Sequence, residues 1–304
     1  MKKTILSAIL TVLVAGTGFA AFSKDDAGKS SAQFLKLGVG GRATAMGNAY
    51  VGVADDSTAI YWNPAGISSI ENVSVSVAHN IMFENIFYDW VSGAKKFGFG
   101  TLGVGIQYLS YGSIDETDDT GLDIGSFKPN DMAVILSYGR AIKDISLGVN
   151  VKYISERIKK TAFAVACDVG GMYKLMDDRL TIGAAAQNLG TKLKFEDEEE
   201  VLPINIKVGC AYRIKKDWLL ALDMNAPYDD EINLGVGLER SFKVTKDINI
   251  SGRAGYNTSL KNTGGLNGLT AGIGSAYNGY CLDYAFVPFG DLGNSHRMSF
   301  GIKF

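Results

Sequence analysis

The chain has 304 residues, of which 46% are hydrophobic and 20% charged, and 37 are glycine. This hydrophobic content excludes an intrinsically disordered chain. The 30 Lys and Arg residues against 32 Asp and Glu residues leave no basic excess of the kind that a nucleic-acid-binding protein uses. The cysteines Cys167, Cys210 and Cys281 have no CxxC spacing and no neighbouring histidine, so we expect neither a metal site nor a disulfide framework.

The first twenty residues have the pattern of a secretory signal peptide. Lys2 and Lys3 precede an apolar stretch over 5–14, and Gly18 and Ala20 supply a small-x-small cleavage site. The apolar stretch is shorter than the roughly 20 residues that a membrane-spanning helix needs. The sequence therefore predicts that residues 1–20 are removed and that the protein is exported. Later apolar runs are broken by glycine or polar residues, which excludes a helical inner-membrane protein.

The next distinctive segment, residues 33–67, reads QFLKLGVGGRATAMGNAYVGVADDSTAIYWNPAGI and is rich in glycine and alanine. Within it, residues 38–43 match the dinucleotide-binding pattern G-x-G-x-x-A. That pattern works in a strand–helix–strand unit, whereas here it follows the signal peptide and precedes segments with a period of two. We therefore reject nucleotide binding and expect no cofactor.

From about residue 70 onwards, bulky apolar residues alternate with glycine or polar residues, as in residues 102–108, which read LGVGIQY. Fourteen such segments are predicted strands, at 72–80, 86–96, 99–111, 131–141, 145–156, 162–174, 179–188, 204–214, 218–226, 231–242, 247–256, 268–276, 280–288 and 296–304. An even number is typical of a bacterial outer-membrane barrel. A soluble β-sandwich also alternates, so the connections must decide between the two.

Every second connection between these strands is short. The predicted tight turns are 97–98, 143–144, 177–178, 215–217, 245–247 and 278–279, and the long connections include 112–130, 189–203 and 257–267. Outer-membrane barrels have this arrangement, with the tight turns on the periplasmic side. Aromatic residues at both ends predict two girdles, formed near the long loops by Tyr108, Tyr111, Tyr153 and Tyr256 and near the tight turns by Tyr138, Tyr173, Tyr212 and Trp218.

The last predicted strand ends on an aromatic residue. Phe300, Ile302 and Phe304 alternate with small or charged residues, a form similar to the signal that the outer-membrane barrel assembly machinery recognises. Ring closure removes strand edges whose unpaired backbone groups would be costly in lipid. We therefore predict an all-β fold, a closed antiparallel transmembrane β-barrel of about 14 strands over 71–304, in contact with outer-membrane lipid and lipopolysaccharide.

Few residues are candidates for catalysis. His79 and His296 are the two histidines, and neither accompanies a serine or cysteine nucleophile motif. The acidic clusters at 115–119 and 196–200 have the composition of solvated loops. The sequence thus indicates a protein without enzymatic activity.

Residues 33–67 resemble the N-terminal segment of the FadL-like outer-membrane proteins, in particular the PorV/PorQ family. The matching pieces are Phe34-Leu35, Gly41-Arg42-Ala43, Met46-Gly47-Asn48-Ala49, Ala54-Asp55-Asp56 and Asn63-Pro64-Ala65-Gly66. The strand number and the terminal Phe304 continue the resemblance over the barrel. It implies that residues 21–70 fold as a small plug inside the lumen and close it from the periplasmic side.

The resemblance also implies which side chains hold this plug. Arg42, Asp55 and Asp56 are expected to form ion pairs with a polar inner wall. Asn63 is expected to be extended before Pro64 and to end a short helix. The predicted plug and lumen contacts are Phe34, Arg42, Met46, Asn48, Asp55, Asp56, Trp62, Asn63 and Pro64.

Two functions follow from the resemblance. One is a plugged channel for uptake or passage of small hydrophobic compounds. The other is an outer-membrane partner or cargo shuttle of the type IX secretion system, with secretion-system proteins as partners. The residues at 54–56 and 63–66 are shared with the transporters, whereas the short acidic loops disfavour an external apolar groove. A structural or antigenic barrel is a third alternative, and we favour transport.

Overall fold

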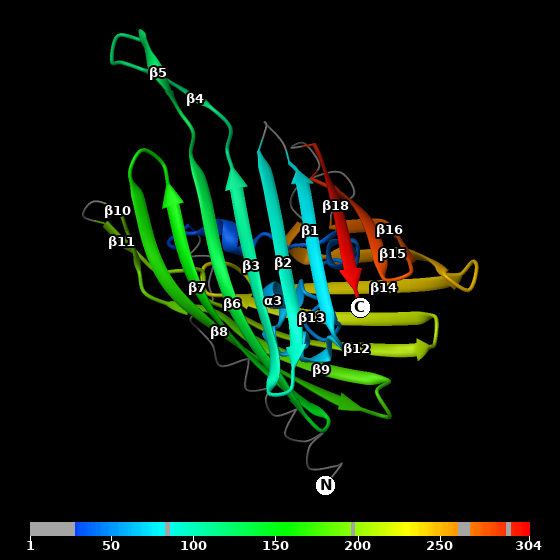
Figure 1. Ribbon diagram of the computed structural model, residues 1–304. Helices are drawn as coiled ribbons and strands as arrows, with labels where there is room; N and C mark the ends of the chain where they lie inside the picture. Colours follow the sequence, from blue (N-terminus) through cyan, green and yellow to red (C-terminus); the bar gives the residue numbers. More distant parts are fainter. Residues whose placement is uncertain (1–27, 83–85, 196–197, 261–267, 290–292) are drawn as a thin grey trace.

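The computed structural model describes residues 28–82, 86–195, 198–260, 268–289 and 293–304, so the predicted signal peptide lies outside the described residues. Fourteen antiparallel strands form a closed barrel, as predicted (Figure 1). The wall strands are β1 (Val73–Ile81), β2 (Phe87–Phe97), β3 (Gly100–Ser110), β6 (Asn130–Ile142), β7 (Ile145–Arg157), β8 (Thr161–Leu175), β9 (Leu180–Gly190), β12 (Asn205–Lys215), β13 (Trp218–Pro227), β14 (Asn233–Lys243), β15 (Ile248–Asn257), β16 (Leu269–Tyr277), β17 (Tyr280–Pro288) and β18 (Asn294–Lys303).

Neighbouring wall strands are consecutive along the chain, and the ring closes between β1 and β18. At this seam the backbones of Val73 and Phe304 exchange two hydrogen bonds, of 3.0 and 2.9 Å. Each predicted strand agrees with the structure to within two residues at either end. Closure leaves no wall strand with an unpaired edge, which is the condition for a sheet that spans lipid.

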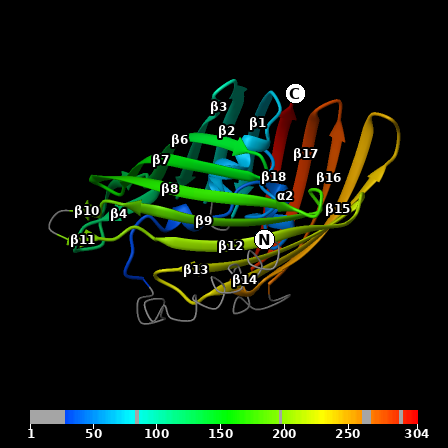
Figure 2. The same ribbon diagram turned by 90° about the horizontal axis from the view of Figure 1, so that it is seen from below.

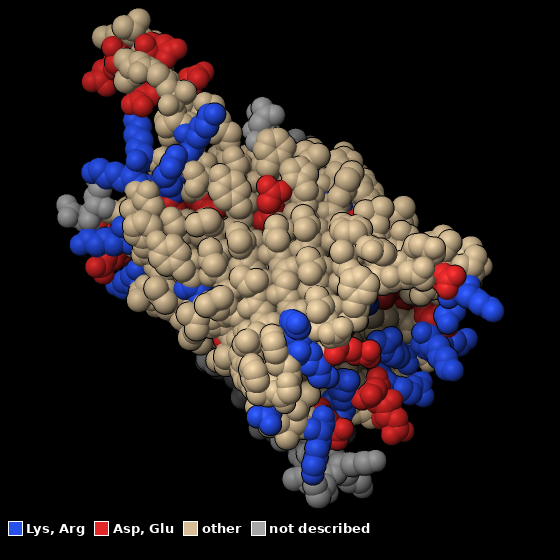
Figure 3. Space-filling model, viewed as in Figure 1, with Lys and Arg blue, Asp and Glu red and all other residues tan. Residues whose placement is uncertain are grey.

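The alternation of the sequence sorts side chains between two faces of the wall. Along β1, Val75 and Val77 point outwards and are exposed, whereas Ser74 and Ser76 point inwards and are buried. The same alternation recurs in the other strands and produces an outer band with few charged residues between two charged ends (Figure 3). His79 and Asp89 interrupt this band as a hydrogen-bonded pair, with 2.6 Å between Nδ1 and Oδ1, across β1 and β2. Such an apolar outer face is the surface that lipid acyl chains contact.

The two rims of the barrel differ in their connections. The tight turns lie at one end of the barrel, as predicted, and we call this end the tight-turn rim. At the opposite end, the long-loop rim, the predicted loops at 112–130 and 189–203 contain short hairpins, which the sequence did not indicate. These are β4 (Ile114–Thr117) with β5 (Asp123–Phe127), and β10 (Leu193–Phe195) with β11 (Glu198–Glu200). The β4–β5 hairpin projects beyond the barrel wall (Figure 1).

Aromatic side chains line the outer face at both rims. Tyr108, Tyr153 and Tyr256 are exposed near the long-loop rim, as expected. Tyr111 departs from the prediction, because its hydroxyl donates a hydrogen bond of 2.7 Å to the buried Asp131 and its ring packs against the interior cluster. The carboxylate on the inner face thus draws this tyrosine away from the girdle.

Residues 30–70, which we call the luminal segment, lie inside the ring (Figure 2). The segment contains η3 (Gln33–Lys36), α2 (Gly41–Ala45), α3 (Ala59–Trp62) and η4 (Pro64–Ser69). No strand precedes α2 among the described residues, so the G-x-G-x-x-A match does not stand in a strand–helix–strand unit. Among the helices of the described ranges, none has the length and apolar character to cross a membrane.

The orientation of the barrel is testable by surface labelling. If the long-loop rim faces the outside of the cell, a peptide tag inserted at Asp119, in the β4–β5 hairpin, is expected to bind antibody on intact cells. A tag at Lys216, in a tight turn, is expected to become accessible only after the outer membrane is permeabilised. Labelling of intact cells at Lys216 would reverse the orientation.

Candidate functional site

The luminal segment is held by side chains of the wall that bond to its backbone. Arg297 of β18 donates to the carbonyl oxygen of Gly38 at 2.8 Å, and Asn257 of β15 donates to that of Gly47 at 2.9 Å. Gln187 of β9 donates to the carbonyl oxygen of Tyr61. Inward-facing polar residues therefore provide partners for the backbone of a segment that has little regular structure of its own.

Glycines in the wall let η4 approach its backbone. A methyl group at Gly148 of β7 would overlap the backbone of Pro64 and Ala65, and one at Gly170 of β8 would overlap the Asn63 amide. Asn63 has extended φ and ψ of −160° and 108° and ends α3, and its side-chain oxygen accepts from Ala65 N at 3.2 Å. The extended residue expected before Pro64 is thus confirmed, and it positions η4 against the glycine pair.

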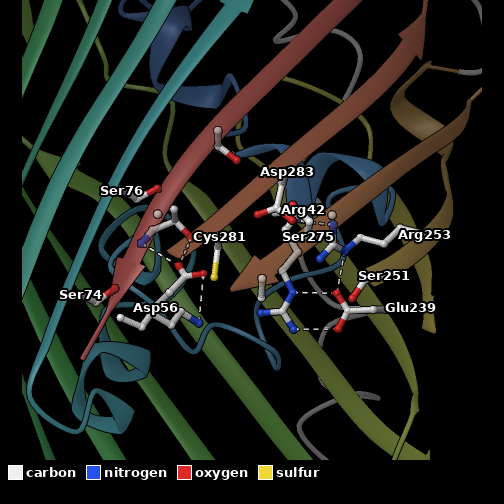
Figure 4. Close-up of a pocket in the computed structure, with 18 of the residues that line it drawn as sticks. Arg42, Asp56, Ser74, Ser76, Glu239, Ser251, Arg253, Ser275, Cys281 and Asp283 are labelled. Carbon is white, nitrogen blue, oxygen red and sulfur yellow. Dashed lines mark hydrogen bonds and ion pairs between the residues drawn. The ribbon is translucent and has the colours of Figure 1, made fainter. Parts of the chain in front are cut away.

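Arg42 is the centre of an ion-pair network in the half of the lumen near the tight-turn rim (Figure 4). Its guanidinium binds Glu239 of β14 through two parallel bonds, Nε to Oε2 at 2.8 Å and Nη2 to Oε1 at 2.9 Å. The same group donates to Asp55 Oδ1 at 2.7 Å and to the Tyr50 hydroxyl at 3.0 Å. Paired bonds between arginine and a carboxylate fix the direction as well as the distance of the contact.

The network continues from Arg42 in both directions along the wall. Glu239 also accepts from Arg253 Nε at 2.6 Å, and Arg253 Nη1 donates to Asp283 Oδ1 at 2.7 Å. On the other side, the Lys303 ammonium of β18 lies 3.3 Å from Asp55 Oδ1. The alternating charges therefore connect three parts of the ring, β14–β15, β17 and β18, through one segment.

The positive groups of the network keep the buried carboxylates ionised. Burial would raise the pKa of the Asp55 carboxyl, but Arg42 and Lys303 outweigh it and hold that pKa well below its usual range. Asp56 lies 3.7 Å from the Lys303 ammonium and accepts from the Tyr50 hydroxyl at 3.2 Å. Both aspartates thus face the closing strand of the barrel.

A polar cavity of about 190 Å³ lies beside this network (Figure 4). Besides the charged residues, serines from both sides of the β1–β18 seam and from β14, β15 and β16 contribute to its lining. They are Ser74, Ser76, Ser241, Ser251, Ser275 and Ser299. A lining of hydroxyl and charged groups suits water and polar solutes and is unfavourable for an apolar compound. No cluster of three or more His, Cys, Asp or Glu positioned to hold a metal ion occurs in the described part of the chain.

Two further contacts hold the middle of the segment. Asp223 of β13 accepts from Tyr50 N at 2.6 Å and from Val51 N at 2.8 Å. The buried ammonium of Lys207 lies 5.0 Å from the ring centre of Tyr61 and 5.1 Å from that of Trp62. Cation–π contacts in a site without water are stronger than at a surface, so Lys207 stabilises α3 against the wall.

The half of the lumen near the long-loop rim contains an apolar cluster beside buried polar side chains such as Gln107, Asp131 and Lys152. Phe34 and Leu35 of η3 are 2% and 4% exposed and belong to one buried apolar cluster. Members of the cluster from this half of the wall and its loops are Leu109, Ile135, Ile154, Ala162, Ala164, Leu193 and Leu202. We call this region the outer chamber, and its own chain fills it with side chains of η3.

The Asp229 carboxylate and two backbone contacts hold the start of the luminal segment at the long-loop rim. Ser31 N donates to the carbonyl oxygen of Val201 at 3.1 Å, and the Tyr88 hydroxyl donates to that of Leu37 at 2.9 Å. Asp229, in the connection between β13 and β14, accepts from Gln33 Nε2 at 2.6 Å, from Lys36 Nζ at 3.0 Å and from the Ser30 hydroxyl. Burial would raise the pKa of Asp229, but the bonds from Gln33, Ser30 and Lys36 lower it below its ordinary value. We call residues 30–37 the strap.

The predicted contact residues divide among these regions. Arg42, Asp55 and Asp56 lie in the ion-pair network, and Phe34 lies in the outer chamber. Met46 is buried beside Gly237 of β14, and the Trp62 indole donates to the carbonyl oxygen of Val39 at 3.1 Å. Asn48 has a positive φ of 61° and lies close to Gly38, and Asn63 and Pro64 meet the wall glycines.

The predicted assembly residues lie on the last strand. Phe300 and Phe304 are exposed on the outer face, and Ile302, which has the same orientation, is partly buried. The Tyr280 ring of β17 contacts both Phe300 and Phe304. These positions place aromatic groups on the outer face beside the β1–β18 seam.

The wall partners of the segment were not identified from the sequence. The charged ones are Asp223, Glu239, Lys207, Arg297, Lys303 and the loop residue Asp229, and Arg253 and Asp283 continue the network along the wall. A signal was present, because Glu239, Arg253 and Asp283 are charged residues at inward positions whose neighbours on the same face are mostly small and uncharged. Such interruptions of a strand pattern are worth treating as candidate lumen contacts.

The solved structures with a similar fold are transporters of the FadL-like group. The toluene transporter TodX of Pseudomonas putida aligns with a TM-score of 0.59 at 11% identity, over 88% of this chain and 99% of TodX. The toluene transporter TbuX of Ralstonia pickettii aligns at 0.57 and 11% identity, over 88% and 98% of the two chains. A FadL homologue of Pseudomonas aeruginosa gives 0.51 and 12%, over 86% and 95%. The fold is therefore that of a FadL-like β-barrel of the bacterial outer membrane.

Sequence comparison gives the family within this class. The family model described as type IX secretion system protein PorV matches residues 23–226, which is more than half of the chain. The chain belongs to this PorV family. Protein NMB0088 of Neisseria meningitidis serogroup B, named as an outer membrane protein, is 32% identical over 136 residues, or 43% of this chain. The matched part of the chain spans about a quarter of the length of that relative, 27%.

Proposed function

We propose that this protein passes small hydrophobic compounds into or across the outer membrane without catalysing a reaction. The observation that carries the proposal is the outer chamber, an apolar cluster at the long-loop rim to which the strap contributes Phe34 and Leu35. An apolar ligand that displaced these two side chains would contact the same apolar residues that now surround them. A binding site of this kind is closed by the protein's own side chains and opens when a ligand displaces them.

The energetic balance supports exchange. Burial of a Phe or Leu side chain contributes about 1.5–3 kcal/mol, and an apolar compound of similar size regains a comparable amount. The remaining cost is the loss of the strap's polar contacts, which are the three bonds to Asp229, the bond from Ser31 to Val201 and the bond from Tyr88 to Leu37. Asp229 accepts bonds from three residues of the strap and is therefore its principal side-chain anchor, whereas the ion-pair network keeps the rest of the luminal segment in place.

The comparisons support the same class of compound. TodX and TbuX, whose fold this chain shares, are named as toluene transporters. The polar cavity at the tight-turn rim opposes free diffusion of an apolar compound along the whole lumen. We infer that the luminal segment acts as a plug, and that it must move, or the compound must leave the lumen, before the compound reaches the polar half.

Substitution of the strap's anchor tests this function. In cells or liposomes that carry the protein, Asp229→Asn is expected to raise the uptake rate of a labelled long-chain fatty acid or aromatic hydrocarbon about fivefold. The reason is the loss of about 1 kcal/mol of charge-assisted bonding to the strap. The matched control is Asp230→Asn, because the neighbouring carboxylate is exposed and bonds to the adjacent Glu231 backbone. Equal uptake by the two variants would contradict gating by the strap.

The same anchor predicts a dependence on pH. Because the pKa of Asp229 is lowered in the folded protein, its contacts are intact above about pH 4 and are lost as the pH falls through the lowered pKa. Uptake by the wild type is expected to rise in that acidic range, and uptake by Asp229→Asn is expected to be independent of pH there.

Membership of the PorV family favours a second function, that of a partner or cargo shuttle in type IX secretion. On this alternative, cells without the gene would take up apolar compounds normally while exported proteins accumulate in the periplasm. Crosslinking from the projecting β4–β5 hairpin would then recover a protein. Unchanged uptake together with periplasmic accumulation would replace the transport proposal.

A further inference from the structure

The two rims of the barrel differ in charge. The tight turns and the strand ends that they join, residues 95–99, 140–144, 174–179, 213–218 and 240–247, contain twelve basic and five acidic residues. At the other rim, residues 112–127, which include the projecting hairpin, contain five acidic residues and no basic one. The tight-turn rim is therefore a basic ring next to the apolar outer band.

Several of these basic groups rest on aromatic rings of the outer face. The Arg240 guanidinium of β14 lies 4.8 Å from the ring centre of Trp218 and 4.4 Å from that of Phe242. Its nearest carboxylate contact is with Asp217 at 3.9 Å, and both side chains are 46% exposed. An exposed guanidinium fixed between two rings keeps donors free for a ligand at the edge of the membrane.

The neighbouring strands repeat the arrangement. Arg179, in the turn between β8 and β9, lies 5.6 Å from the ring centre of Tyr212 and donates to its hydroxyl at 3.2 Å. On β2, the Lys95 ammonium lies 5.7 Å from the ring centre of Phe97. The cations therefore stand at the depth of the aromatic girdle, where lipid headgroups lie.

We propose that the tight-turn rim binds the anionic phosphate headgroups of glycerophospholipids, with Arg240 and Arg179 as its principal ligands. A guanidinium recognises phosphate through parallel charge-assisted bonds, and basic residues at a membrane surface attract anionic lipid. Below Arg240 on the same face, Leu222, Leu234 and Val236 are exposed and can pack against the acyl chains. The site can therefore contact both the phosphate headgroup and the acyl chains of one lipid, whereas free phosphate has no acyl chains.

The tryptophans of the chain make this site measurable. Of the three tryptophans, Trp62 and Trp90 are buried inside the barrel at 2% and 0% exposure, and Trp218 lies on the outer face beside Arg240. Quenching of tryptophan fluorescence by brominated lipid therefore reports mainly the lipid next to this site. The full-length protein is placed in phosphatidylcholine vesicles containing brominated phosphatidylglycerol or, separately, brominated phosphatidylcholine.

In the wild type, we expect brominated phosphatidylglycerol to quench at least threefold more effectively than brominated phosphatidylcholine at equal mole fraction. High salt is expected to reduce this preference, and millimolar inorganic phosphate at constant ionic strength is expected to leave it unchanged. The double variant Arg240→Gln, Arg179→Gln is expected to bring the ratio to about one. The control Arg157→Gln, at the end of β7 near the other rim, is expected to keep the wild-type ratio.

Several outcomes would overturn the proposal. They are equal quenching by the two lipids in the wild type, an unchanged preference in the double variant, and loss of the preference upon addition of phosphate. Comparison of the two lipids within each variant cancels any direct effect of the substitutions on Trp218 fluorescence. Slower gel migration after boiling verifies that each variant has formed its barrel.

Discussion

Replacement of Arg42 by alanine is expected to release the luminal segment from the inner wall. The variant removes the paired bonds to Glu239, which join the segment to β14, and the bond to Asp55 within the segment. Glu239 keeps Arg253 and Asp55 keeps Lys303, so the cost is of order 2 kcal/mol, below that of breaking an isolated buried pair. This raises the population of the displaced segment about 30-fold.

Single-channel recording in planar bilayers measures this effect. The wild type is expected to show rare, brief openings, and Arg42→Ala larger or more frequent ones. Arg140→Ala is the matched control, because Arg140 lies exposed on β6 at the tight-turn rim and takes no part in the network. Identical conductance of Arg42→Ala and the wild type would mean that the arginine does not hold the segment.

Substitution of Gly148 by alanine is expected to have an effect of similar size. The added methyl group would overlap the backbone of Pro64 and Ala65, and backbone atoms cannot rotate away as a flexible side chain can. Overpacking of this kind costs about 1–3 kcal/mol, and here it falls on the contact between η4 and the wall. The barrel itself should still form, because Gly148 pairs with its neighbours through backbone groups.

Gly171, on the adjacent strand β8, provides the control. A methyl group there would have its nearest neighbour at 3.8 Å, an ordinary van der Waals distance. In a background with a cysteine at Ser68 of η4, Gly148→Ala is expected to speed labelling by a small maleimide and to increase conductance, whereas Gly171→Ala should change neither. Labelling at the wild-type rate in Gly148→Ala would show that η4 does not depend on this close approach.

The wall of the barrel was predictable because every wall residue faces one of only two environments. Lipid outside and a packed lumen inside impose opposite polarity on successive residues, so the alternation in residues 102–108 is a direct record of the two environments. The C-terminal Phe304 and the tight turns followed from the same logic. In contrast, the β4–β5 hairpin consists of exposed residues with little alternation in polarity, and no such signal marked it.

For each contact of the candidate site, the residue on the luminal segment was predictable and its partner on the wall was not. The segment's own residues, such as Arg42 and Asp55, stood out because charged groups are unusual in a run of glycine and alanine. Their partners depend on which strands the closed ring brings around the segment, and Glu239 is 197 residues from Arg42. Such pairs require the register of the whole wall, so the sequence of either element is insufficient to identify them.

The path of the luminal segment constrains how the barrel is completed. The strap lies at the long-loop rim, whereas β1 begins at the tight-turn rim, so the chain is threaded along the lumen before its first wall strand. The last strand closes against β1 where Ser57 N donates to Ser74 and Asp55 meets Lys303. If the ring closed first, large side chains such as Phe34 and Trp62 would have to enter the lumen through the opening at one rim. The threaded order instead lets the segment serve as the internal template around which the final pair of strands is aligned.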